Sequence, residues 1–484
     1  MSVQPLSVIS VVAREGVRYP APDEWYSPSE RYPEWPEEPV TVPNQTYRMV
    51  RDVLSQAGLD SERFGSKDWN PLGAYIRPGS RVFVLCNFVY QRRPSENEEA
   101  LHAKCVHGSV LRALVDYVLK AVGPGGTVSF GNGPLQSCDW ERVLADTGAA
   151  RVREYYRSRG LNVVPRDLRL HVIERDRFGV VHTVEDRDPG DSVAVDLGSD
   201  SLLSEIADQN ARFRVSDYDP RQTEACHHGG SHKYLIHRAV LESDAVISLS
   251  KLKTHEKVGV TCGLKGFVGA VTHKHCLAHH RYGTPSVGGD EYSRNLVGLN
   301  LGSWFHDWVH MRPAGASFQA PFQIADRYMR AAMRRIGARP AGGWCGNDTA
   351  WRMSLDLARI LHFASPEGVM QEGLQRTHLS LIDGIVGGEG EGPLNPTAVR
   401  SGTLLFADDV AAGDRVACRL MGFNPSRIPL IREAFEPRRC RLPARAEEQA
   451  RVVFNGAPVA ESALPLIIGR PFRPPAGWRA RLPG

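Results

Sequence analysis

The stretch DAVISLSKLKTHEKVGVTCGLKGFVGAV, residues 244–271, decides the fold of this chain. It opens with an apolar, β-branched run over residues 245–249, the pattern of a strand buried inside a sheet. Lysines, a histidine and repeated glycines follow directly. In an open α/β sheet, ligands bind where loops leave the carboxyl ends of the strands. The stretch therefore predicts both a core strand and a binding site.

The site predicted after this strand is cationic. Lys251, Lys253, His255 and Lys265 follow the run, among glycines that let backbone N–H groups approach an anion. A solvated basic loop would also contain lysines, but such a loop rarely mixes them with so many glycines and apolar residues. We expect Lys251 and Lys253 to bind an anion. His255 and Lys265 are expected to be catalytic, because burial among cations lowers the pKa of a lysine.

Strand and helix patterns alternate along the rest of the chain. This alternation predicts an α/β fold with a mainly parallel sheet flanked by helices, an arrangement that allows two lobes. Residues 1–74 are interpreted as an N-terminal strand, a Pro- and aromatic-rich wrap and a helix. Residues 75–435 form the predicted α/β core, with a helical insertion near 300–345. Residues 436–484 form an Arg- and Pro-rich extension.

The composition is that of an ordinary globular protein, and it argues against several functional classes. Across 484 residues the net charge is only +4, which is too small to indicate binding to nucleic acid or to a membrane surface. No run approaches the roughly 18 consecutive apolar residues of a membrane helix. We therefore expect no nucleic-acid partner and no membrane partner, while the oligomeric state stays open.

The cysteines and the N-terminus indicate a cytoplasmic protein. No two of the nine cysteines have the C-x-x-C spacing used by zinc ribbons and ferredoxin-type iron–sulfur clusters, so no ferredoxin motif is present. Scattered cysteines are typical of a reducing compartment. The first residues, MSVQPLSVISVVAREG, lack the basic segment with which a signal peptide begins.

A cluster of histidines follows the central stretch. His273, His275, His279 and His280 lie within eight residues and close to Cys276. Imidazole is the commonest metal ligand near neutral pH. The cluster therefore has enough donors for a transition metal, although its spacing matches no standard local metal motif. A loop that binds phosphate or carboxylate explains the same residues, and both interpretations stay open.

Further candidates for contact with an anion lie elsewhere in the chain. Asn87 stands near the carboxyl end of the strand pattern at residues 81–89, where ligand contacts are expected. Arg281 follows the histidine cluster. Glu389 and Glu391 lie in the segment GEGEGP, which is expected to be a flexible loop after a strand. Neighbouring carboxylates of this kind serve acid–base chemistry or hold a cation.

Taken together, these residues resemble the bacterial and archaeal family called domain of unknown function 362 (DUF362). The resemblance rests on KLKTHEKVGVTCGLKGFVG, IDGIVGGEGEGP and DVAAGDRVACRLMGFNP, at residues 251–269, 382–393 and 409–425. It also includes residues 131–140, 279–292 and 344–353, and so covers most of residues 75–435. Many members of the family carry an appended ferredoxin segment, which is absent here. The biochemistry of the family is largely undefined.

A second, local resemblance is to the nickel-pincer lactate racemases. It is limited to His255, to Lys265 ten positions later and to the glycines around them. In that family a histidine transfers a proton and the lysine holds the cofactor. The nickel-binding histidine would correspond here to His279 or His280.

The function expected from the sequence is that of a DUF362 enzyme. Its substrate or cofactor would be a small anion with a carboxylate or phosphate group, and its chemistry proton transfer, as in an isomerase, or redox. We expect His255 and Lys265 to face one cleft, beside Lys251 or Lys253 and the GEGEGP loop. Two alternatives remain, a redox protein that carries a metal or electrons, and a binding module for anions without catalysis.

Overall fold

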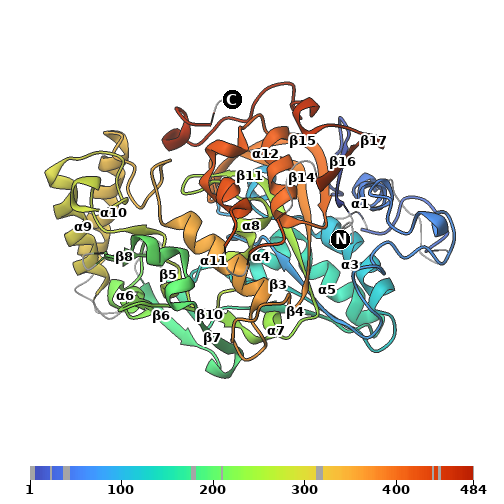
Figure 1. Cartoon of the computed structure of the whole chain (residues 1–484), viewed down its shortest axis with the longest axis horizontal. Coiled ribbons are helices and arrows are strands. Elements are labelled where there is room, and N and C mark those ends of the chain that lie inside the picture. Colours follow the sequence, from blue (N-terminus) through green and yellow to red (C-terminus); the bar gives the residue numbers. More distant parts are fainter. Residues whose placement is uncertain are drawn as a thin grey trace.

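In the computed structural model, the chain folds around one large sheet that carries helices on both faces (Figure 1). The predicted fold class, α/β with a mainly parallel sheet flanked by helices, is confirmed. The structure describes the whole chain except residues 1–5, 22, 23, 25, 36–43, 176–180, 209, 210, 312–319, 439, 440, 445–448, 483 and 484.

The central strands of the sheet all run in one direction. In spatial order, the sheet contains β17 (Ala457–Pro458), β16 (Ala450–Phe454), β1 (Ser7–Ala13), β15 (Asn395–Ala407), β14 (Thr377–Glu391), β11 (Ala245–His255), β2 (Arg81–Cys86), β3 (Thr127–Asn132) and β4 (Val163–Asp167). From β14 to β4 every neighbouring pair is parallel. Only β15 breaks this direction inside the sheet, because it pairs antiparallel with both β14 and β1.

The middle strand, β11, has its side chains in two separate cores. Ala245, Ile247 and Leu249 join the core on one face of the sheet, whereas Val246 and Leu252 join the core on the other. All 11 residues of the strand are buried. A parallel strand covered on both faces has to be apolar on both, which explains the continuous apolar run at residues 245–249.

Two layers of helices enclose the sheet. The first face packs against α1 (Gln45–Gln56), α3 (Gly108–Val122), α4 (Trp140–Thr147) and α5 (Ala149–Ser158). The second face packs against α8 (Cys262–Gly266), α11 (Ala350–Phe363), α12 (Val410–Leu420) and α13 (Pro429–Arg432). A further helix, α2 (Glu98–Lys104), contacts β14 and β15.

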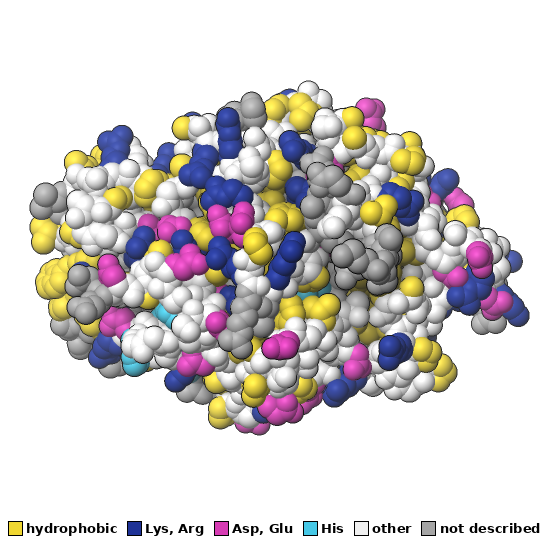
Figure 2. Space-filling view, in the orientation of Figure 1, with side chains coloured by type: hydrophobic (Ala, Val, Ile, Leu, Met, Phe, Trp, Pro, Cys, Tyr) yellow, Lys and Arg dark blue, Asp and Glu magenta, His cyan; other side chains and the backbone are white. Residues whose placement is uncertain are grey.

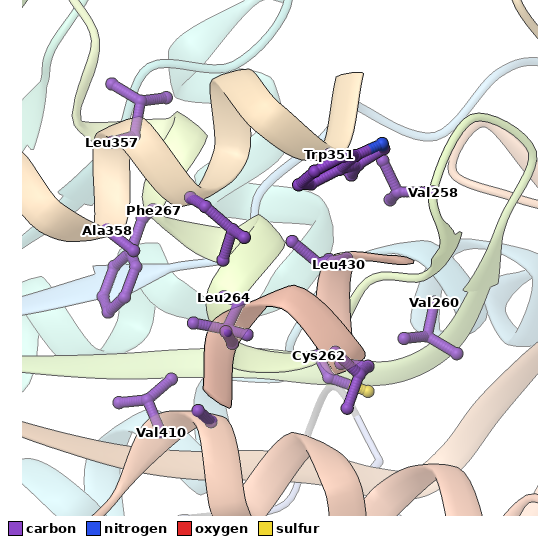
Figure 3. Close-up of a cluster of buried hydrophobic side chains, with 14 of the residues drawn as sticks. Val258, Val260, Cys262, Leu264, Phe267, Trp351, Leu357, Ala358, Val410 and Leu430 are labelled. Carbon is purple, nitrogen blue, oxygen red and sulfur yellow. The ribbon is translucent and has the colours of Figure 1, made fainter. Parts of the chain in front are cut away.

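The short helix α8 is held in place by packing and by one carboxylate. Figure 3 shows Leu264 of α8 among apolar side chains that include Leu430 of α13 and Val410 of α12. The carboxylate of Asp414 accepts hydrogen bonds from the backbone N–H groups of Gly263, at 2.6 Å, and Leu264, at 2.8 Å. These contacts fix the segment that carries Lys265.

A smaller part of the molecule lies at one end of the large sheet (Figure 1). It contains the hairpin of β5 (His171–Arg175) and β6 (Val181–Asp186), the sheet of β7 (Ser192–Asp196), β10 (Ser231–His237) and β9 (His227–His228), the pair of β8 (Phe213–Arg214) and β13 (His280–Arg281), and the helices α6 (Pro220–Cys226), α7 (Arg238–Leu241), α9 (Val297–His310) and α10 (Ala320–Arg335). The helices α9 and α10 lie where the sequence predicts a helical insertion.

Both terminal segments contribute to the main sheet. β1 lies between β15 and β16, so the first described strand pairs in parallel with a strand from the C-terminal extension. Beyond β17, the extension passes the end of β14, where Glu389 binds Arg470 and Glu391 binds the backbone N–H of Ala476. The extension is thus fastened to the core.

One face of the surface carries charged side chains of both signs. On the face shown in Figure 2, Lys and Arg side chains are interspersed with Asp and Glu. Every helix in the described part of the chain is too short or too polar to cross a lipid bilayer.

Candidate functional site

One cavity of about 360 Å³ lies at the carboxyl ends of β11, β2 and β3. This is the edge where open α/β sheets bind ligands, and the volume suits a small molecule. Its walls come from the end of β11 and the turn after it, the loops after β2 and β3, the α8 region, residues 215–218 and α10.

The cavity is strongly cationic. Among the described residues of its wall, two have acidic side chains, Asp217 and Glu256. The basic side chains of its wall are Lys253, Lys257, Lys265, Lys274, Arg330 and Arg334. Such an excess of cations in a confined space attracts an anion.

Several of these lysines have neutral partners in place of carboxylates. Lys253 Nζ donates to Asn87 Oδ1, at 2.8 Å, and to the backbone oxygen of Lys104, at 2.6 Å. Lys274 Nζ donates to the backbone oxygen of Gly133, at 2.5 Å. Lys265 Nζ makes no hydrogen bond or ion pair with the described residues. Lys253 and Lys274 are therefore held in position without a carboxylate to neutralise them.

Burial lowers the pKa of each of these lysines. Desolvation, followed by repulsion from neighbouring lysines, lowers the pKa of Lys253 and of Lys265 to about 7. Burial also lowers the pKa of Lys257 and of Lys274 to about 8. An anion in the cavity would favour the protonated forms, so ligand binding and proton uptake are coupled here.

Two histidines of the cavity wall are neutral and have complementary tautomers. Burial and the nearby lysines hold the pKa of His255 and His279 well below the usual value. His255 Nδ1 accepts the backbone N–H of Lys257, at 3.1 Å, so its proton is on Nε2. His279 Nδ1 donates to the backbone oxygen of Leu277, at 2.7 Å, so its Nε2 is a proton acceptor.

Glycines allow two segments of the wall to touch. The N–H of Gly133, after β3, donates to the backbone oxygen of Gly269, at 2.7 Å. A Cβ at Gly133 would lie 2.8 Å from the oxygen of Val271, and a Cβ at Gly269 would lie 2.6 Å from Asn132 Nδ2. Side chains at either position would push the walls apart.

The structure brings several of the predicted site residues together. Asn87, Lys253, His255, Lys265 and His279 all line this one cavity. β11 does not end at residue 249 as the apolar run suggests, but continues to residue 255. The strand itself therefore delivers its lysine and histidine to the edge of the sheet.

Lys251 lies elsewhere, although it is only two residues from Lys253. Its Nζ is 3.1 Å from Asp383 Oδ2 and donates to the hydroxyl of Tyr19, at 3.0 Å. All three side chains are buried. Lys251 is thus neutralised inside the core of the sheet and does not line the cavity.

The other predicted anion contacts also lie outside the cavity wall. Glu389 and Glu391 belong to β14, not to a flexible loop, and bind the C-terminal extension. Of the GEGEGP segment, only Pro393 lines the cavity. Arg281 lies beside Asp290, whose carboxylate accepts its backbone N–H at 2.5 Å.

The predicted histidine cluster separates into different environments. The Nδ1 atoms of His273 and His275 lie 2.7 Å apart, and the ring of His171 packs 4.4 Å from that of His273. His279 lines the cavity, whereas His280 is buried with its Nε2 4.0 Å from Glu291 Oε1. In the described part of the chain these four histidines form no group close enough to hold one metal.

Four basic residues of the wall were not among the predicted ligands. Lys257 and Lys274 lie close to the central stretch in sequence, so the abundance of lysines there was an available signal. Arg330 and Arg334 are one helical turn apart on α10. The basic sequence of this helix is typical of a solvent-exposed helix. Their position in the cavity wall follows only from the packing of α10 in the tertiary structure.

Comparison with known proteins identifies a family but no characterised relative. A family model described as domain of unknown function (DUF362) matches residues 182–419. No curated protein and no solved structure matches the chain. The matched segment includes β11, α8, both cavity histidines and β14.

Proposed function

We propose that the protein, whose residues 182–419 match the DUF362 family model, is an enzyme acting on a small molecule with carboxylate or phosphate groups. The observation that carries the proposal is the wall of the cavity, with six basic side chains and two acidic ones. Carboxylates and phosphates are the anions that lysine and arginine bind in proteins.

The chemistry proposed is proton transfer to and from the bound anion. His255 carries its proton on Nε2 and His279 has a free electron pair on Nε2, as their backbone partners require. One imidazole can therefore donate a proton while the other accepts one, which is what an isomerase or a lyase needs. Lys265, with a pKa of about 7, has both protonation states available at neutral pH.

Lysines 253 and 265 have separate roles in this proposal. The Nζ of Lys253 is fixed by Asn87 and a backbone oxygen, so it orients the anion. Lys265 has no such partner in the described structure and takes the ligand itself as its counter-ion. Fixed cations that meet developing negative charge stabilise a transition state without reorganising.

Binding is tested by thermal unfolding with pyrophosphate and with citrate, at an ionic strength matched with sodium chloride. The unmodified protein is expected to be stabilised, by about 2.7 kcal/mol at one hundred times Kd. Lys265→Met keeps the apolar stem and removes the charge, and is expected to lose the effect. Lys233→Met, at an exposed position on β10, is the control and should respond like the parent. An equal response of Lys265→Met would contradict the proposed site.

Catalysis is tested separately from binding. Small molecules that co-purify with the native protein are identified by mass spectrometry and assayed for turnover. His255→Asn and His279→Asn are expected to bind the same molecule and to lose turnover by about 10²–10⁴-fold, the usual contribution of a general acid or base. Full turnover in both variants would remove the histidines from the mechanism, and binding without any turnover in the parent would favour the binding module.

A further inference from the structure

A second group of polar side chains lies beside the cavity and outside the mechanism above. Asp217, His306 and His310 each place one ligand atom within 4.8 Å of the others. The two histidines are four residues apart on α9, so they lie on the same face of the helix. Asp217 reaches them from the segment that lines the cavity.

A buried carboxylate next to this group supports its interpretation as a metal site. Asp326 of α10 is only 2% exposed, and its Oδ1 has no hydrogen-bond partner among the described residues. Its Oδ2 lies 2.8 Å from His306 Nδ1 and 4.0 Å from His310 Nε2. Buried carboxylate oxygens are seldom left unpaired, so Asp326 can take a further positive charge besides Arg330, whose Nε lies 3.6 Å from its Oδ2.

The neighbours of His306 indicate which of its two nitrogens would face a metal. Arg330 Nε lies 3.0 Å from His306 Nδ1 and 3.6 Å from Asp326 Oδ2. Because Nδ1 cannot donate to Asp326 and also accept from Arg330, we assign its proton to the bond with the carboxylate. The electron pair of His306 is then on Nε2, which accepts the backbone N–H of Asp217 at 3.5 Å, so a metal would replace this long hydrogen bond.

We propose that Asp217, His306 and His310 bind a divalent transition metal at the rim of the cavity, with Asp326 as the hydrogen-bonded partner that orients His306. Two imidazoles and one carboxylate are a donor set for zinc, iron, cobalt or nickel, and they leave coordination positions open. A carboxylate behind a metal-binding histidine is the usual outer partner. Asp217 also lines the cavity. A molecule bound in the cavity would therefore lie next to the open coordination positions of the metal.

This proposal does not depend on the proposed function. The metal site is argued from its own ligands and from the unpaired oxygen of Asp326, and it would bind a metal with the cavity empty of anion. Its ligands also share no residue with the expected cluster of His273, His275, His279 and His280.

The test is a titration of the untagged, chelator-treated full chain with Co²⁺, followed by visible absorption, in the absence of phosphate and citrate. One equivalent is expected to bind with the d–d bands of nitrogen and oxygen ligands. Asp217→Asn and His310→Ala are expected to weaken binding at least about tenfold, and Asp326→Asn by about 10–100-fold. His228→Ala, an exposed histidine on β9, is the control and should bind like the parent.

Circular dichroism of each variant keeps loss of the metal distinct from loss of the fold. Asp217 is exposed, so Asp217→Asn is the variant whose effect on metal binding is least affected by a change in folding. No stoichiometric binding by the parent would overturn the proposal. So would unchanged affinity in folded Asp217→Asn and His310→Ala, or binding that is lost only in His273→Ala. None of these outcomes bears on the anion-dependent stabilisation, which Lys265→Met tests.

Discussion

At the scale of single residues, two lysines on one strand have opposite environments. Lys251 forms a buried ion pair with Asp383, at 3.1 Å. Lys253 has only neutral oxygen acceptors and lies among other cations. The first lysine therefore serves the stability of the fold, whereas the second is available to a ligand. Residue type alone does not separate these roles.

Lys251→Met is expected to destabilise the protein by about 3–5 kcal/mol, because it leaves the buried carboxylate of Asp383 without its charged partner. The measurement is urea unfolding at neutral pH. The anion-dependent stabilisation should persist in this variant, since Lys251 does not line the cavity. Unchanged stability would show that the ion pair contributes nothing to folding.

At the scale of elements, the turn after β11 is held by the far end of the chain. β12 (Gly259–Val260) pairs back onto the last residues of β11 and closes this turn. The indole Nε1 of Trp478 donates to the backbone oxygen of Glu256, at 2.7 Å, and the ring is 1% exposed. The C-terminal extension thus braces the turn that presents His255 and Lys257 to the cavity.

Trp478→Ala is expected to cost about 3–5 kcal/mol of stability, the usual range for removing a buried aromatic ring. It should also weaken anion binding, because the braced turn carries two residues of the cavity wall. Calorimetry and the pyrophosphate titration measure the two effects. Arg479→Ala, at the exposed neighbouring position, is the matched control. Equal stability of the two variants would contradict the bracing role.

At the scale of the whole molecule, the cavity concentrates charge that the surface does not show. The net charge is only +4, yet the basic side chains of the wall outnumber the acidic ones by six to two. The lowered pKa of Lys253 and Lys265 follows from burial first and from the other lysines second. The free-energy cost of burying these charges in the folded protein should therefore depend on pH.

The pH dependence is expected to have a defined sign. Between about pH 7, the folded pKa of Lys253 and Lys265, and their ordinary pKa of 10.5, the unfolded chain binds more protons than the folded one. These lysines therefore make the ligand-free protein more stable as pH rises through that window, and add no further change below it. Anion affinity should fall over the same window, because the lysines lose their charge.

A comparison with the double variant Lys253→Met/Lys265→Met isolates this contribution. Other groups titrate in the same pH range. One of them is Asp414, because burial raises its pKa to about 8. The pH dependence of the unfolding free energy of the parent therefore contains the contributions of several groups. The difference in unfolding free energy between the parent and the variant, measured from pH 6 to pH 10, should shrink as pH rises. A difference independent of pH would show that the two lysines keep their ordinary pKa in the folded protein.

The sequence by itself determined the fold class and the segment that lines the cavity at the edge of the sheet. The apolar run at residues 245–249 specifies a strand covered on both faces, and the glycines and lysines after it mark the ligand edge of a parallel sheet. Both signals are local, because they depend on the spacing of side chains along one segment. Asn87, His255 and Lys265 could be placed in one site for that reason.

Only the tertiary structure decided which charged residues face the cavity. Lys251 meets Asp383, which lies 132 residues later in the chain, and Glu389 meets Arg470, 81 residues later. The histidines expected to bind one metal separate, while Asp217 approaches His306 and His310 from a distant segment. A buried charge is stabilised by whichever partner folding brings within a few ångströms. That partner is set by the packing of strands and helices, which no local pattern encodes.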